Sequence, residues 1–312
     1  MIRLRVICSL LVAILGAVSV QAQPVAKQTK KPSPPFQWVN PPAGKIAGVT
    51  HHSFKSTSLK QPVGYCLYLP PSYRETGDAV EQKYPVVYYL HGGRPGSETK
   101  SIRLATYIDA AMRAGEVPEM VYVFVNGGPV SHYNMPDDPT AQGQGVFLNE
   151  LIPHIEQTYR VIANRSGRGL EGFSQGGRGT SRIMFKHPEL FCSAAPGGGG
   201  YSTEKNISEN NGEENPKLIF APGDNTWDLA RAYAKNLQAR FPLRIQFHVG
   251  TKGFNYENNL AFMSFLAEKG IPFEKVIVPD AGHSAMQIYE TRGNQIMNFH
   301  AKSFGLDTDV AE

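Results

Sequence analysis

Ser174 lies in a short segment whose residue types suit covalent chemistry. Residues 172–177 read Gly-Phe-Ser-Gln-Gly-Gly and match the G-x-S-x-G pattern of a nucleophile elbow. An apolar strand-like run precedes this motif and a helical pattern follows it. Glycine is needed on both sides of Ser174 because the chain turns from strand to helix within a few residues. The turn brings the hydroxyl to a helix N-terminus, whose dipole favours developing negative charge, so we predict that Ser174 is a catalytic nucleophile.

His283 is the histidine best placed to act as the base for Ser174. It follows the last predicted strand and lies C-terminal to the serine, as in triads whose chain order is serine, acid, histidine. A neutral imidazole takes the proton of the serine and later returns it to the leaving group. We therefore predict a catalytic pair of Ser174 and His283.

A second glycine-rich turn lies upstream of the elbow. Residues 91–93 read His-Gly-Gly and end an apolar strand. Turns of this type supply backbone N–H groups to an oxyanion hole, together with the N–H group of the residue after the nucleophile. We expect Gly93 and Gln175 to form that hole and the ring of His91 to lie buried beneath the turn. His51 and His52 are adjacent, but no third ligand has suitable spacing, so we predict no catalytic metal and no cofactor.

Strand-like and helical patterns alternate along most of the chain. Such alternation indicates a mostly parallel central sheet with helices on both faces. Strands are predicted at 63–69, 84–90, 120–125, 168–173, 191–195, 244–249 and 273–278, and helices at 145–159 (with a kink at Pro153), 176–187, 227–240, 256–269 and 285–299.

Two long polar stretches, 126–143 and 197–216, each follow a strand. Loops at the carboxyl ends of parallel strands form the ligand crevice of such sheets, although both stretches could also be solvated insertions. Three aromatic residues in or beside these loops could stack on an aromatic acyl group or a sugar. The candidates for substrate binding are Tyr133, Tyr201 and Trp227, of which Trp227 could equally belong to the core.

Five segments occur in an order that resembles a known family. They are HGG at 91–93, ELIPHIEQTYR at 150–160, GFSQGG at 172–177, VGTKGFNYENN at 249–259 and PDAGH at 279–283. This order resembles the putative esterase family of the α/β-hydrolase superfamily, which includes esterase D-like enzymes and the feruloyl and acetylxylan esterases of carbohydrate esterase family 1. The resemblance implies an α/β-hydrolase fold and a carboxylic ester hydrolase that removes feruloyl or acetyl groups from polysaccharide-derived substrates through a Ser-His-acid acyl-enzyme mechanism.

The triad acid is where this chain departs from the family pattern. Relatives read G-T-x-D in the loop after the strand 244–249, and this chain has Gly253 at the place of that aspartate. Glu257 is our first candidate because it lies four residues further on and has a longer side chain. Asp224, in a Gly-Asp-Asn turn, is the alternative acid, and Asp280 reads better as a turn residue. A Ser-His pair without a functional acid also stays open.

Two other functions are compatible with these motifs. An acyltransferase of the same superfamily would need the same serine and histidine. A non-catalytic carbohydrate-binding protein could have arisen by loss of the acid at Gly253.

The N-terminus has the pattern of an export signal. Arg3 and Arg5 precede an apolar run that is too short to span a bilayer, and Val20-Gln21-Ala22 offers small residues to a signal peptidase. We predict a signal peptide at 1–22, a proline-rich tail or linker at 23–45 and a single catalytic domain at 46–312. The protein is expected to be secreted or periplasmic and not membrane-bound after cleavage.

Charge and cysteine content narrow the class of partner. Once the basic residues of 1–45 are set aside, 25 basic and 27 acidic side chains remain, so the body has no basic excess for nucleic acid. Cys66 and Cys192 lie in apolar runs and are expected to be buried free thiols rather than a disulfide. The predicted partner is a small-molecule or oligosaccharide ester, and the sequence leaves the oligomeric state open.

Overall fold

The computed structural model describes residues 35–73, 81–201, 206–208, 214–235 and 241–306. The chain divides into two units, Met1–Pro35 and Phe36–Glu312, and the described helices and strands belong to the second unit. The predicted signal peptide and most of the predicted tail lie outside the described residues.

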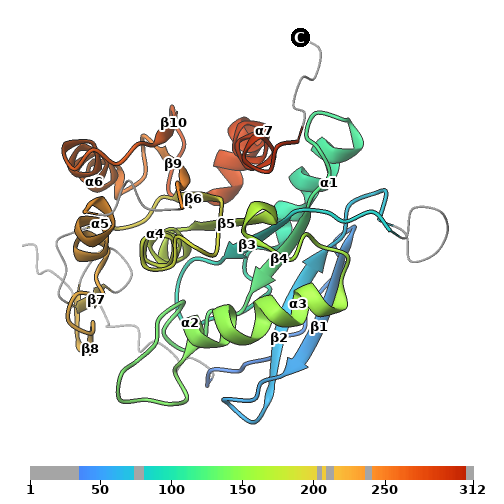
Figure 1. Cartoon of the computed structure of the whole chain (residues 1–312), viewed down its shortest axis with the longest axis horizontal. Coiled ribbons are helices and arrows are strands. Elements are labelled where there is room, and N and C mark those ends of the chain that lie inside the picture. Colours follow the sequence, from blue (N-terminus) through green and yellow to red (C-terminus); the bar gives the residue numbers. More distant parts are fainter. Residues whose placement is uncertain (1–34, 74–80, 202–205, 209–213, 236–240, 307–312) are drawn as a thin grey trace, which may run out of the picture. The chain divides into compact units, whose positions relative to one another are not determined.

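Eight strands form one central sheet (Figure 1). The two pairings on the β1 side are antiparallel and all the others are parallel. This confirms the predicted mostly parallel sheet. In spatial order the strands are β1 (Val49–Lys55), β2 (Pro62–Tyr68), β4 (Val121–Val125), β3 (Val86–Leu90), β5 (Arg168–Phe173), β6 (Ser193–Gly197), β9 (Arg244–Gly250) and β10 (Glu274–Val278).

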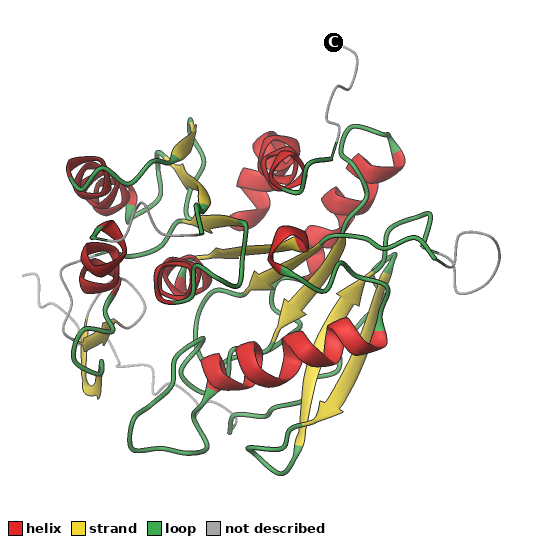
Figure 2. Cartoon of the chain, viewed as in Figure 1, coloured by secondary structure: helices red, strands yellow, loops and turns green. Residues whose placement is uncertain are grey.

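Helices pack on both faces of this sheet, as Figure 2 shows. On one face lie α1 (Ala105–Arg113) and α7 (Ala285–Ser303). The other face is covered by α2 (Gly143–Val146), a π-helical turn (Phe147–Leu151), α3 (Ile152–Thr158), α4 (Gln175–Lys186), α5 (Thr226–Ala234) and α6 (Tyr256–Glu268). Short 3₁₀ turns occupy Ile102–Leu104 and Arg165–Gly167.

Strand β3, near the middle of the sheet, is apolar throughout because both of its faces are covered. In β3 the side chains of Val86, Tyr88 and Leu90 join the core on the α4 side, and Val87 and Tyr89 join the core on the α7 side. All five residues are buried. A strand buried on both faces reads as a continuous apolar run.

Three sequence expectations need correction. The helix predicted at 145–159 is irregular ahead of Pro153, where the chain forms the π-helical turn, and the proline lies in the first turn of α3. The stretch 197–216 is not wholly a loop, because β7 (Asn206–Ser208) pairs with β8 (Glu214–Ile219) in a separate hairpin. Helix α1 was not among the predicted elements.

The end of the predicted tail, from Phe36 onward, belongs to the second unit. Trp38 is buried, and its carbonyl accepts a hydrogen bond of 2.7 Å from the backbone N–H of Gly64. The backbone N–H of Asn40 donates to the buried carboxylate of Glu98 at 2.5 Å. Burial of an aromatic ring and a paired carboxylate therefore fixes this end of the segment, which its proline content did not suggest.

Cys66 and Cys192 are both buried free thiols, which confirms the expectation from their apolar surroundings. Burial raises the pKa of the Cys66 thiol to about 12 and also raises the pKa of Cys192. Neither residue is therefore a candidate nucleophile.

Arg182 joins the segments that follow β4 and β8. Its guanidinium lies 2.7 Å from the Asp224 carboxylate and also donates to the backbone carbonyls of Asp224 and His132. The aromatic rings of Tyr133 and Phe220 lie against the same guanidinium at 4.1 and 5.2 Å. The arginine side chain is only 1% exposed, so its charge depends on these partners.

We expect Asp224→Asn to lower the free energy of unfolding by about 2 to 4 kcal/mol, because it leaves the buried guanidinium of Arg182 without its carboxylate. The measurement is urea denaturation followed by tryptophan fluorescence. Asp280→Asn is the matched control, since the Asp280 carboxylate pairs with Lys252 but is 81% exposed. Equal denaturation midpoints for both variants would show that the buried pair adds nothing.

Candidate active site

The elbow at Ser174 is strained and closely packed. The residue has φ of 62° and ψ of −116°, between the end of β5 and the start of α4. A Cβ atom at Gly176 would lie 1.9 Å from the Leu90 carbonyl oxygen, and one at Gly172 would lie 2.6 Å from the Gly176 carbonyl oxygen. Both glycines are therefore required by the close approach of β3, β5 and α4. A non-glycine residue with positive φ at such a turn is typical of a site where strain serves function.

The predicted oxyanion turn lies directly against this elbow. A Cβ atom at Gly92 would be 3.1 Å from the Ser174 Cβ atom and 3.7 Å from its Oγ atom. Gly93 has φ of 68°, and its carbonyl oxygen accepts a hydrogen bond of 2.6 Å from the Ser131 hydroxyl, which orients the peptide between Gly93 and Arg94. Gln175 is the first residue of α4, so its backbone N–H points out of the helix N-terminus.

His91 stays beneath the turn as a buried structural residue. Its Nδ1 lies 3.0 Å from the Gly92 carbonyl oxygen, and its Nε2 accepts from the backbone N–H groups of Ser97 and Gly127 at 3.3 and 3.2 Å. Burial and the neighbouring His132 hold its pKa well below the usual range. The neutral ring therefore braces the glycine turn from inside.

The structure brings His283 to Ser174 from the loop between β10 and α7. The imidazole Nε2 lies 2.8 Å from the Ser174 Oγ atom. The rings of Phe173 and Phe254 lie against the imidazole with centroid separations of 4.9 and 4.3 Å. This partial burial lowers the pKa of His283 from its usual 6.5, so the ring is held in the neutral form that accepts a proton.

The loop that follows β9 is fastened to the loop that carries His283. Backbone N–H groups of Thr251 and Lys252 donate to the carbonyl oxygens of Val278 and Ala281 at 3.0 and 2.9 Å. The backbone N–H of Asp280 donates back to the Thr251 hydroxyl at 2.9 Å. The two loops thus form one unit that holds residues 250–255 beside the histidine.

No predicted carboxylate reaches the other ring nitrogen of the histidine. The Nδ1 atom of His283 is buried and has no hydrogen-bond partner among the residues that the structure describes. Glu257 is exposed in the first turn of α6, and Asp224 is committed to Arg182 and Lys186. Asp280 pairs with Lys252 at the surface. The structure therefore brings neither Glu257 nor Asp224 into a hydrogen bond with His283: Glu257 is exposed at the start of α6, and Asp224 is paired with a buried arginine.

The backbone at Gly253 could carry the missing side chain. A Cβ atom built there would lie 3.8 Å from the His283 Cα atom, 3.4 Å from the Asn255 Oδ1 atom and 3.1 Å from the Gly250 carbonyl oxygen. Its backbone is not in the left-handed region, and only a few tenths of an ångström separate the tightest of these contacts from an ordinary one. Glycine is therefore not required here by geometry, in contrast to Gly176.

The three aromatic residues predicted to bind substrate belong to the packing instead. Tyr133 and Tyr201 are each 1% exposed, and the Tyr201 hydroxyl lies 2.8 Å from the Ser181 hydroxyl. Trp227 donates its indole N–H to the Tyr201 carbonyl oxygen at 2.9 Å and packs on Phe265 of α6. Each ring packs on an aromatic neighbour in the core or beside Arg182.

Two residues beside His283 were missed by the sequence reasoning. The Phe254 ring is 61% exposed although it contacts the imidazole, so it offers an apolar surface to a substrate. Asn255 is buried with its Oδ1 atom unpaired. Both residues directly follow Gly253, in the loop expected to hold the acid, and this position in the sequence could have identified them.

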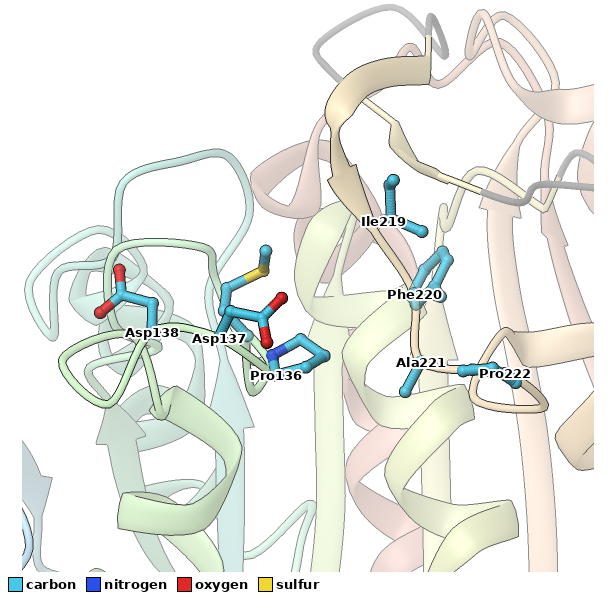
Figure 3. Close-up of a pocket in the computed structure, with 8 residues that line it drawn as sticks. Pro136, Asp137, Asp138, Ile219, Phe220, Ala221 and Pro222 are labelled. Atoms are coloured by element: carbon cyan, nitrogen blue, oxygen red, sulfur yellow. The ribbon is translucent and has the colours of Figure 1, made fainter.

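A pocket of about 480 Å³ lies between the segment after β4 and the segment after β8 (Figure 3). Pro136, Asp137 and Asp138 lie on one side, and the opposite side is formed by residues 219–222. The Phe220 ring packs on Tyr133 at 5.2 Å, which connects this pocket to the Arg182 cluster. The pocket combines apolar rings with two carboxylates. This mixture suits a ligand that has both apolar faces and hydroxyl groups.

Within the described ranges, no group of three His, Cys, Asp or Glu side chains is arranged to hold a metal ion. The same residues include no helix with the length and apolar character needed to cross a membrane.

The chain is similar to curated esterases over part of their length. It is 26% identical over 261 residues to an esterase of Mycobacterium tuberculosis, which covers 75% of this chain and 55% of that protein. It is 26% identical over 157 residues to an endo-1,4-beta-xylanase/feruloyl esterase of Xylanibacter ruminicola, which covers 47% of this chain and 20% of that protein. The chain thus spans about half or less of the length of these two relatives.

Solved structures share the fold. A ferulic acid esterase aligns with a TM-score of 0.66 at 22% identity, covering 82% of this chain and 98% of that one. An S-formylglutathione hydrolase from Agrobacterium tumefaciens aligns with a TM-score of 0.65 at 20% identity, covering 84% and 98%. At these identities the similarity establishes the α/β-hydrolase fold. The sequence model of the family described as "Putative esterase" matches residues 56–271, about two thirds of the chain, and the protein belongs to that family.

Proposed function

We propose that this protein is a serine carboxylic ester hydrolase. The observation that carries the proposal is the 2.8 Å contact between Ser174 Oγ and His283 Nε2 at a strained elbow. A nucleophile and a base within hydrogen-bond reach, beside backbone donors at a helix N-terminus, form the arrangement that acyl transfer needs.

The chemistry proceeds in two halves. Ser174 Oγ attacks the ester carbonyl carbon while His283 Nε2 takes the hydroxyl proton, and the backbone N–H groups of Gly93 and Gln175 stabilise the oxyanion. Collapse of the intermediate breaks the bond to the alcohol oxygen, which leaves with the proton from the imidazolium. A water molecule then attacks the acyl-enzyme with His283 as base, and the carboxylic acid and free serine are formed.

The substrate proposal is narrower and rests on other support. The relatives include proteins named as feruloyl and ferulic acid esterases. The exposed Phe254 ring beside His283 suits a flat aromatic acyl group. We propose feruloyl or acetyl esters of polysaccharide-derived fragments as the substrate class, and a panel of esters from acetate to ferulate tests it.

We also propose export, on the pattern of residues 1–22. A polymer-derived substrate outside the cell would require it. N-terminal sequencing of the exported protein should begin at Gln23 or within a few residues, and a mature protein that retains the apolar run would refute it.

The two alternative functions make different demands. An acyltransferase uses the same serine and histidine, and product analysis with a sugar acceptor separates transfer from hydrolysis. A non-catalytic carbohydrate-binding protein has no need for a strained elbow with a base in contact, so the geometry at Ser174 favours an enzyme.

Ser174→Ala should lower ester hydrolysis by at least about a thousandfold, because it removes the atom that forms the acyl-enzyme. p-Nitrophenyl acetate provides the assay, and a serine-directed phosphonate should label the wild-type chain at Ser174 alone. If a correctly folded Ser174→Ala variant retained turnover, Ser174 would not be the nucleophile.

Glu257→Gln should leave kcat within about twofold of the wild type, because the exposed carboxylate does not contact His283. A triad acid would instead cost roughly a hundredfold or more when neutralised. Steady-state kinetics on the same ester distinguishes these outcomes, and Asp280→Asn tests the remaining surface carboxylate. A large drop in kcat for Glu257→Gln would restore that residue as the acid.

The acid limb of kcat/KM should have its midpoint below pH 6.5. Burial lowers the pKa of His283, and only the neutral ring accepts the proton of Ser174, so activity persists as the pH falls through 6.5 and is lost below the depressed pKa. The ring faces the Ser174 hydroxyl and two phenylalanine rings, with no carboxylate to oppose this direction. A midpoint above pH 6.5, in a protein whose fluorescence shows an intact fold, would contradict the lowered pKa of His283.

A further inference from the structure

The histidine needs a hydrogen-bond acceptor that no carboxylate supplies. For Nε2 of His283 to accept the serine proton, the ring proton must lie on Nδ1. That atom is buried without a partner. An unpaired buried N–H costs free energy and leaves the tautomer unfixed, so an acceptor beside Nδ1 would serve both stability and catalysis.

Asn255 presents an unpaired acceptor in the same loop. Its Nδ2 group donates to the carbonyl oxygens of Gly198 and Gly199, so the amide orientation is set and Oδ1 faces the other way. The residue is 6% exposed, and its Oδ1 atom has no hydrogen-bond partner within the described part of the chain. Although Asn255 is the N-cap of α6, its side chain makes no capping hydrogen bond. The side-chain amide of Asn255 is therefore held in a fixed orientation without capping its own helix.

The unpaired acceptor and the backbone of His283 lie beside the same position. The point where a Gly253 side chain would begin lies 3.4 Å from Asn255 Oδ1, 3.1 Å from the Gly250 carbonyl oxygen and 3.8 Å from the His283 Cα atom. The Gly250 oxygen accepts one backbone hydrogen bond, from Gly253, and retains a second lone pair. A buried water typically makes about three hydrogen bonds, and these groups offer one donor and two acceptors.

We propose that Asn255 is the positioning residue for His283, and that its Oδ1 acts through one water molecule held beside Gly253. The water accepts from Nδ1–H of His283 and donates to Asn255 Oδ1 and the Gly250 carbonyl oxygen. This inference rests on the proposed serine hydrolase function and extends it. A neutral relay fixes the tautomer of the base but does not balance the charge of the imidazolium as a carboxylate does. The site is thus a triad with an amide at its third position.

The test is a double-mutant cycle between Asn255→Ala and Gly253→Asp, with kcat and KM measured on p-nitrophenyl acetate. Asn255→Ala should lower kcat by about tenfold with KM within about twofold, because it acts on the base and not on substrate binding. Gly253→Asp should raise kcat by at least about tenfold, because it supplies a carboxylate to the same nitrogen. In the Gly253→Asp background, Asn255→Ala should cost less than about twofold, since the relay is then bypassed.

Asn259→Ala is the matched control. Asn259 is also buried, and its Nδ2 group donates to the same Gly199 carbonyl oxygen at 2.6 Å, but it lies one turn further along α6. Asn259→Ala should leave kcat within about twofold of the wild type. This result would show that losing a hydrogen bond to the Gly199 carbonyl oxygen is not what lowers kcat in Asn255→Ala.

The outcomes that overturn the proposal are distinct. Equal losses in Asn255→Ala and Asn259→Ala, or an Asn255→Ala loss that persists unchanged beside Gly253→Asp, would reduce Asn255 to a packing residue. If Asn255→Ala does not fold, the Gly253→Asp variant decides: an unchanged kcat would refute the proposed relay but not the proposed hydrolase function. Wild-type hydrolysis no faster than that of Ser174→Ala would instead refute the proposed function itself.

Discussion

The whole site depends on how closely the backbone of α4 approaches the end of β3. Gly176 packs so tightly on the Leu90 carbonyl oxygen that any side chain would overlap it. This contact forces the turn at Ser174 into a positive φ and directs its hydroxyl out of the sheet edge. The same contact places the 91–93 turn against the serine, so the nucleophile and the turn predicted to supply oxyanion donors are positioned by one packing constraint.

Around this fixed point the remaining groups arrive on loops that brace one another. His91 supports the glycine turn from beneath, and Ser131 holds the Gly93 carbonyl from the segment after β4. The loops after β9 and β10 are joined by hydrogen bonds and form one unit. The base is therefore carried on a structure separate from the elbow, and the 2.8 Å contact at Ser174 is where the two meet.

Patterns tied to backbone geometry could be predicted from the sequence. The apolar runs predicted the parallel strands because a strand buried on both faces leaves little choice of residue, and the glycines of the elbow predicted a turn that only they can make. Side-chain destinations could not be predicted in the same way. Tyr133, Tyr201 and Trp227 sit in or beside crevice loops, yet their rings turn inward onto Arg182, Phe262 and Phe265. Glu257 is close to Gly253 in sequence, but the first turn of α6 carries its side chain into solvent.

The two glycines of this site differ in a way that bears on how such enzymes change over time. Gly176 is locked by the packing, whereas Gly253 has neither a left-handed backbone nor a severe clash. A change of the middle nucleotide alone converts an aspartate codon into a glycine codon. A lineage can therefore lose the carboxylate of the triad at this position in one mutational step, without disturbing the fold that carries it.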